Sequence, residues 1–123
     1  KEPNPEILLQ EAINAAKDSD IVLYFGGLNK NENQDSEGND RKSYNLPYGQ
    51  DRLISELAKV NKNIVVTIIS GNAVAMPWIK EVPAIVEGWF GGTESGNAIA
   101  SILTGKVNPS GKLPMTIAEK LED

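Results

Sequence analysis

The sequence contains neither cysteine nor histidine in its 123 residues. Without cysteine the chain forms no disulfide, no zinc–thiolate site and no cysteine nucleophile. Without histidine it lacks serine–histidine hydrolase triads and the commonest transition-metal ligand. Any acid–base chemistry must therefore come from carboxylates, lysines or tyrosines, and we expect neither a metal nor another cofactor.

Positive charge and long apolar runs are also scarce. Lys and Arg number 12 against 17 Asp and Glu, which gives a net charge of −5 at pH 7. Nucleic acid and anionic membrane surfaces both attract basic patches, so we expect neither as a partner. No apolar run approaches the roughly 20 residues of a membrane helix. The localisation stays open, and a periplasmic or secreted location would fit a full-length protein.

The spacing of the apolar residues predicts alternating helices and strands. Helices are predicted over 4–18, 46–61 and 93–104, and strands over 21–25, 64–70 and 84–89. The first two strand segments lack polar alternation, which is typical of strands buried on both faces. The order predicts an α/β fold, a three-layer α/β/α sandwich with a mainly parallel sheet, in a single domain over 1–123. Because three strands are few and a helix comes first, we expect the C-terminal part of a larger domain.

A long polar loop follows the first predicted strand. Residues 29–45 (NKNENQDSEGNDRKSYN) contain only one large apolar side chain, Tyr44. Ligands of open parallel sheets bind beyond the carboxyl ends of the strands, and loops longer than about 12–15 residues are usually functional or disordered. The four carboxylates of this loop belong to Glu32, Asp35, Glu37 and Asp40. Position alone does not favour one of them.

A glycine-rich turn and two tryptophans are further candidates. The turn GGTESG (91–96) lacks the spacing of phosphate-binding loops. We interpret it as a tight turn with Thr93 as N-cap and Glu94 balancing the helix dipole, rather than as an anion site. Aromatic faces suit the C–H faces of sugars. Trp89 ends an apolar stretch and is expected in the core. For Trp78 core packing and substrate contact both stay open, so the substrate-binding residues are not predicted beyond Trp78 as a weak candidate.

Three segments together resemble the C-terminal α/β-sandwich domain of family 3 glycoside hydrolases, which include many β-glucosidases and β-xylosidases. They are SEGNDRKSYNLPYGQDRLI (36–54), SGNAVAMPW (70–78) and IVEGWFGGTESGNAIASILTGKVNPSGKLPMT (85–116). The last segment is the most specific, because it combines the tryptophan, the GG-x-E-x-G turn, the helix and NPSGKLP in the order of the family.

The resemblance implies a retaining β-glycosidase in which a (β/α)8 barrel precedes this domain. In that family the barrel supplies the nucleophilic aspartate. A sandwich loop commonly supplies the general acid/base, in a motif like the EG of SEGNDR. Carried over to this sequence, that residue is Glu37, with Glu32 as the fallback. The resemblance also implies a β-glycoside or oligosaccharide substrate shared with the barrel, so we expect the chain alone to be inactive.

Two other interpretations stay open. The chain could be a stand-alone flavodoxin-like module that binds a sugar or anion at GGTESG and the 26–46 loop, or a purely structural domain with an inert loop. We further expect loop 28–45 to be mobile, because its polar side chains have nothing to bury against. An exposed sheet edge predicts some homo-dimerisation. The sugar, the linkage and the anomer would depend on the barrel and are not predicted.

Overall fold

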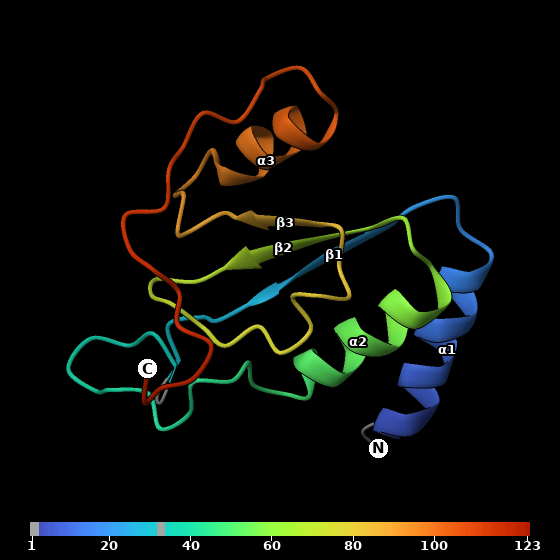
Figure 1. Ribbon diagram of the computed structural model, residues 1–123, viewed down its shortest axis with the longest axis horizontal. Coiled ribbons are helices and arrows are strands. Elements are labelled where there is room, and N and C mark those ends of the chain that lie inside the picture. The colour runs from blue at the N-terminus through green and yellow to red at the C-terminus, as the bar shows by residue number, and fades with distance from the viewer. Residues whose placement is uncertain (1–2, 32–33) are drawn as a thin grey trace.

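A computed structural model describes residues 3–31 and 34–123 of the chain. The elements, in chain order, are α1 (Pro5–Lys17), β1 (Val22–Gly27), α2 (Gln50–Val60), β2 (Ile64–Ile69), β3 (Ala84–Glu87) and α3 (Ser95–Leu103) (Figure 1). All six predicted elements are confirmed. Helix α2 begins four residues later than predicted, because Tyr48 and Gly49 have positive φ angles that end the preceding turn.

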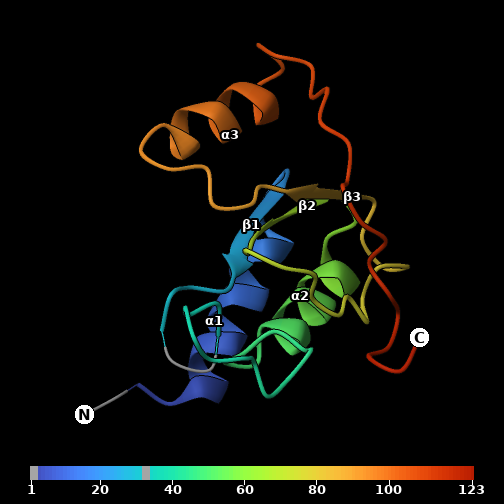
Figure 2. The same cartoon turned by 90° about the vertical axis from the view of Figure 1, so that its left-hand side faces the viewer.

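The three strands form one parallel sheet in the order β1-β2-β3. Val22 pairs with Ile64, and Val65 pairs with Ala84. Helices α1 and α2 lie on one face of the sheet and α3 on the other, as two perpendicular views agree (Figures 1 and 2). The predicted α/β/α layering with a parallel sheet is therefore confirmed.

The core lies between the central strand β2 and helix α2. Val66 and Ile68 of β2 and Ile54 and Ala58 of α2 have no exposed surface. The prediction of a strand buried on both faces is right for β2 and wrong for β1. In β1, Tyr24 is buried, but Phe25 on the opposite face is 54% exposed, because α3 leaves an open space over that face of the strand.

A glutamine fixes the end of β1 to the start of α2. The Oε1 atom of Gln50 accepts hydrogen bonds from the Gly27 amide (2.8 Å) and the Tyr24 hydroxyl (3.0 Å). Its Nε2 donates to the Gly27 carbonyl oxygen at 2.9 Å. The long loop therefore starts from a strand end whose backbone groups are held in place.

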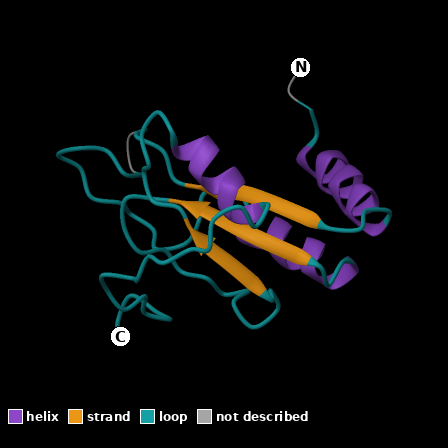
Figure 3. Cartoon of the chain, turned by 90° about the horizontal axis from the view of Figure 1, so that it is seen from above, coloured by secondary structure: helices purple, strands orange, loops and turns teal. Residues whose placement is uncertain are grey.

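All three strands run in the same direction, so their carboxyl ends lie at one edge of the sheet. The segments that follow β1 (28–49), β2 (70–83) and β3 (88–94) leave from this edge (Figure 3). The carboxyl edge is where a ligand site of such a sheet is expected.

In the described part of the chain, no helix is long and apolar enough to cross a membrane.

Candidate functional site

The loop after β1 is attached to the body of the molecule by several contacts. Its first residue, Leu28, donates its amide to the Ile69 carbonyl at 2.8 Å. Gln34 is buried, accepts from the Asn29 amide at 3.0 Å and donates to the Tyr48 hydroxyl at 2.8 Å. The reason given for a mobile loop, polar side chains that cannot bury, is therefore wrong for this part of it.

The predicted acid/base residue lies on the exposed part of this loop. Glu37 is exposed and precedes Gly38, whose φ of +80° turns the chain. No ion pair joins Glu37 to another residue in the described ranges. Asp40 is also exposed, and the fallback candidate Glu32 lies outside the described residues. Glu37 is thus accessible to a substrate or to a surface that closes over the loop.

Two charged residues that the sequence did not single out flank this exposed part. The Oδ2 atom of Asp35 accepts a hydrogen bond of 2.6 Å from the Gly71 amide. Arg41 donates from Nη2 to the Ala73 carbonyl oxygen, and its Nε lies 3.8 Å from Asp35 Oδ1. These contacts join the loop after β1 to the segment after β2. No local pattern reveals them, because their partners are more than 30 residues away.

A half-buried carboxyl group, Glu87, ends β3 at the same edge of the sheet. Its Oε1 atom accepts a hydrogen bond from the Trp89 amide (3.2 Å). It also lies 3.3 Å from the Ser70 hydroxyl, whose one proton is shared with the nearer Asn72 carbonyl oxygen (2.8 Å). Burial raises the pKa of Glu87 above its usual value, and the negative charge of Asp35 adds to the rise, while the contacts with the Trp89 amide and the Ser70 hydroxyl oppose it. The sequence analysis missed Glu87. The available signal was a single acidic residue at the end of the otherwise apolar AIV run.

The structure buries Trp78, which the sequence left open, more deeply than Trp89, which was expected in the core. Trp78, the candidate for substrate contact, has no exposed surface, and its Nε1 donates to Asp51 Oδ1 at 2.8 Å. It has no free ring face to offer a sugar and is a core residue. Trp89, expected in the core, is only half-buried and has a φ of +49°.

The turn before α3 also differs in detail from its prediction. The N-cap of α3 is Glu94 rather than Thr93, and no side chain caps the helix. Instead, Asn97 Nδ2 donates to Glu94 Oε2 at 2.6 Å. Among the described residues no cluster of acidic side chains is arranged to hold a metal ion.

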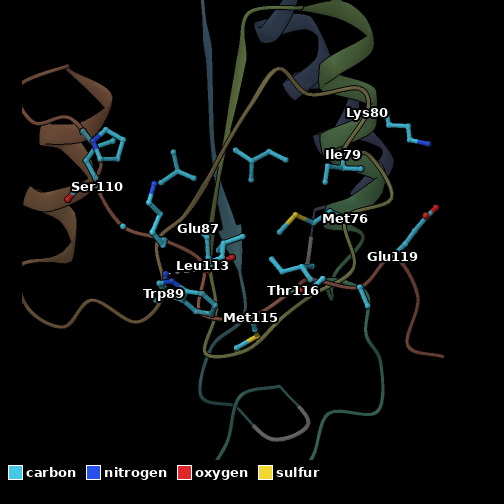
Figure 4. Close-up of a pocket in the computed structure, with 18 of the residues that line it drawn as sticks. Met76, Ile79, Lys80, Glu87, Trp89, Ser110, Leu113, Met115, Thr116 and Glu119 are labelled. Carbon is cyan, nitrogen blue, oxygen red and sulfur yellow. Dashed lines mark hydrogen bonds between the residues drawn. The ribbon is translucent and has the colours of Figure 1, made fainter. Parts of the chain in front are cut away.

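A large apolar groove lies between β3, α3 and the C-terminal segment 107–119. Its volume is about 1190 Å³. Figure 4 shows Met76, Leu113 and Met115 around the groove, with Glu87 and Trp89 beside them. No residue of the 28–49 loop lines it. The groove therefore does not include Glu37, the acid/base candidate, which lies on that loop.

Comparison with known proteins identifies the family of the chain. Residues 6–123 match the model for the glycosyl hydrolase family 3 C-terminal domain. "Beta-glucosidase BoGH3A" of Bacteroides ovatus is 55% identical over 116 residues, which are 94% of this chain and 16% of that protein. "Beta-glucosidase B" of Emericella nidulans is 48% identical over 118 residues, 94% of this chain and 14% of that protein.

Solved structures agree with this assignment. The crystal structure of a β-glucosidase from Kluyveromyces marxianus in complex with glucose is 35% identical, with a TM-score of 0.93, over 99% of this chain and 14% of that one. The Bifidobacterium adolescentis GH3 β-glucosidase is 40% identical, with a TM-score of 0.86, over 98% of this chain and 18% of that one. The chain thus spans less than a fifth of the length of these relatives. It belongs to the family of glycosyl hydrolase family 3 C-terminal domains.

Proposed function

We propose that this chain supplies one of the two catalytic carboxyl groups of a retaining β-glycosidase. Glu37 is the general acid/base, and a (β/α)8 barrel outside this chain supplies the nucleophile and most of the sugar site. The observation that carries the proposal is the position of Glu37. It is exposed on the loop beyond the carboxyl end of β1, in a chain whose relatives are named β-glucosidases.

The chemistry explains why such a loop would cross to a second domain. In a retaining glycosidase one carboxylate attacks the anomeric carbon while a carboxylic acid protonates the leaving oxygen, and the two groups lie about 5–5.5 Å apart. In the second step the same acid, now a carboxylate, takes a proton from the attacking water. Glu37 would serve this acid and base role, and the bond broken is the one between the sugar and the leaving oxygen.

The proposal also requires a particular environment for Glu37. A general acid must keep its proton near neutral pH, which burial or a neighbouring carboxylate can achieve. The barrel would provide both, since it would cover the exposed loop and bring its own carboxylate. Asp35, whose side chain is 10% exposed, and the half-buried Glu87 are less accessible to a substrate than Glu37, and both accept hydrogen bonds within the domain.

The test compares two classes of substrate in a full-length enzyme in which this chain follows a family 3 barrel. The variant Glu37→Gln should lose about 10²–10⁴-fold in kcat/KM for glycosides with poor leaving groups. Activated aryl glycosides need little protonation of the leaving oxygen, so their first step should change far less. Glu32→Gln should leave the ratio between the two substrate classes unchanged.

The matched control is Glu11→Gln, which removes one exposed carboxylate from helix α1. It should behave like the wild type on both substrate classes. If Glu37→Gln lowers both classes equally or neither of them, Glu37 is not the acid. If Glu32→Gln gives the selective loss instead, the role belongs to Glu32.

A further inference from the structure

The exposed segment that carries Glu37 is held at both of its ends. Asp35 lies two residues before Glu37 and Arg41 four residues after it. Asp35 is bonded to the Gly71 amide and Arg41 to the Ala73 carbonyl, so both ends attach to the same short segment after β2. We call these two residues and their contacts with Gly71 and Ala73 the clasp.

The clasp is shielded from water, unlike the loop that it closes. The side chains of Asp35 and Arg41 are 10% and 14% exposed, whereas residues 37–40 are exposed. Hydrogen bonds that involve a charged partner are about twice as strong as neutral ones, and shielding from water strengthens them further. The clasp is therefore the strongest described attachment of the segment 36–40.

The surface to which the clasp attaches is itself well packed. Ser70 has no exposed surface, and its hydroxyl donates to the Asn72 carbonyl at 2.8 Å. A Cβ atom at Gly71 would lie 2.9 Å from the Phe90 ring and 3.3 Å from Asp35 Oδ2. Glycine at position 71 thus lets the Asp35 carboxylate approach the backbone. Through this segment the clasp is continuous with the central strand β2.

We infer that Asp35 and Arg41 are positioning residues for Glu37: their clasp fixes the segment 36–40 so that the acid/base carboxyl reaches the sugar in a reproducible place. The inference rests on the proposed function of Glu37. A misplacement of about 1 Å can lower a rate by 10²-fold, and catalytic groups need to be held within about 0.5 Å. A segment with exposed side chains, such as 37–40, cannot reach that precision by its own packing.

The experiment uses the full-length enzyme with Asp35→Ala, which removes both contacts of the carboxylate. We expect a loss of about 10–100-fold in kcat for glycosides with poor leaving groups and a change below about threefold for activated aryl glycosides, with KM nearly unchanged. Asp35→Asn keeps an acceptor for the Gly71 amide and should lose less. Arg41→Lys should likewise recover part of the activity that Arg41→Ala loses.

The double variant Asp35→Ala/Glu37→Gln gives the decisive measurement, which is how strongly the rate depends on the leaving group. If the clasp acts through Glu37, Asp35→Ala should add almost nothing to the leaving-group dependence of Glu37→Gln. An equal loss on both substrate classes, in a variant with a wild-type circular dichroism spectrum and melting temperature, would mean that the clasp is only structural and would overturn the inference. Where Asp35→Ala does not fold, Arg41→Ala, which removes the contact with the Ala73 carbonyl, decides by the same criteria.

Failure of the inference can be told apart from failure of the proposed function. If Glu37→Gln shows the selective loss and the Asp35 variants do not, only the positioning role is overturned. If Glu37→Gln shows no selective loss, the proposed function fails and the positioning role falls with it.

Discussion

Replacement of Trp78 by phenylalanine tests whether this residue belongs to the core or to a sugar site. Trp78 has no exposed surface and donates a hydrogen bond of 2.8 Å to Asp51. The change removes the indole N–H and leaves a smaller ring in a closed space. Truncation of a buried tryptophan to alanine costs about 3–5 kcal/mol, and a hydrogen bond to a charged group contributes about 1.5–3 kcal/mol.

The expected loss for Trp78→Phe lies below the sum of these terms. Phenylalanine still fills most of the cavity, and Asp51 is only half-buried, so water can replace part of the lost hydrogen bond. We expect the free energy of unfolding to fall by about 2–3 kcal/mol. With a urea dependence of about 1–3 kcal/mol per M, the unfolding midpoint should move down by roughly 0.7–3 M.

The same variant should change how stability depends on pH. Burial raises the pKa of Asp51, and the hydrogen bonds from Trp78 and from the Leu46 amide lower it. Loss of the tryptophan donor therefore raises this pKa further. Between the unfolded and the raised folded pKa the native state binds more protons, so stability falls as pH rises. That fall should extend to higher pH in Trp78→Phe than in the wild type.

Urea unfolding followed by far-UV circular dichroism measures both effects. Trp89→Phe is the matched control, because Trp89 is half-buried and its ring makes no hydrogen bond to another described residue; it should change stability by less than about 1 kcal/mol. An unchanged midpoint in Trp78→Phe, together with a raised KM of the full-length enzyme, would refute the core assignment and return Trp78 to the sugar site.

Three further predictions follow from the structure. Burial raises the pKa of Glu87, so the free energy of unfolding should fall as pH rises from the ordinary glutamate pKa to the raised one. Glu87→Gln removes the ionisable group and should make this pH dependence weaker, as measured by urea unfolding at a series of pH values. Gly27→Ala should cost at least about 1–3 kcal/mol by the same assay, because φ is +130° there and a Cβ would lie 2.0 Å from the Ile69 carbonyl oxygen, whereas Gly111→Ala, with open space, should be neutral. The chain by itself should dimerise weakly through β1, and Phe25→Lys should abolish the dimer in analytical ultracentrifugation; a dimer that persists in that variant uses another surface.

The fold was largely predictable from the sequence because its signals are local. Apolar spacing marks α1 and α2, and the unbroken β-branched run of β2 marks the centre of the sheet. Both ends of the helical region also carry local signals: Asn4 caps α1 by accepting from the Glu6 amide at 3.0 Å, and Gly105, just after α3, has a φ of +74°. Each of these features depends on a few neighbouring residues.

The candidate site was only partly predictable because much of it depends on distant contacts. Glu37 is proposed from a family motif, and its role stays a prediction; the structure adds that it is exposed. The clasp of Asp35 and Arg41 depends on Gly71 and Ala73, and no pattern within the loop encodes those partners. The position of Trp78 was left open for the same reason, since its burial depends on packing against α2 and on Asp51.

The proposed two-domain mechanism is tested most directly by the turnover of aryl β-glycosides with this chain alone and with the chain joined to a family 3 barrel. Catalysis needs two carboxyl groups held at a fixed separation, and the proposal places one of them outside this chain. We predict no turnover above background by the isolated chain, and turnover by the joined enzyme that needs Glu37 for poor leaving groups. Measurable turnover by the pure isolated chain that disappears in Glu37→Gln would contradict the mechanism.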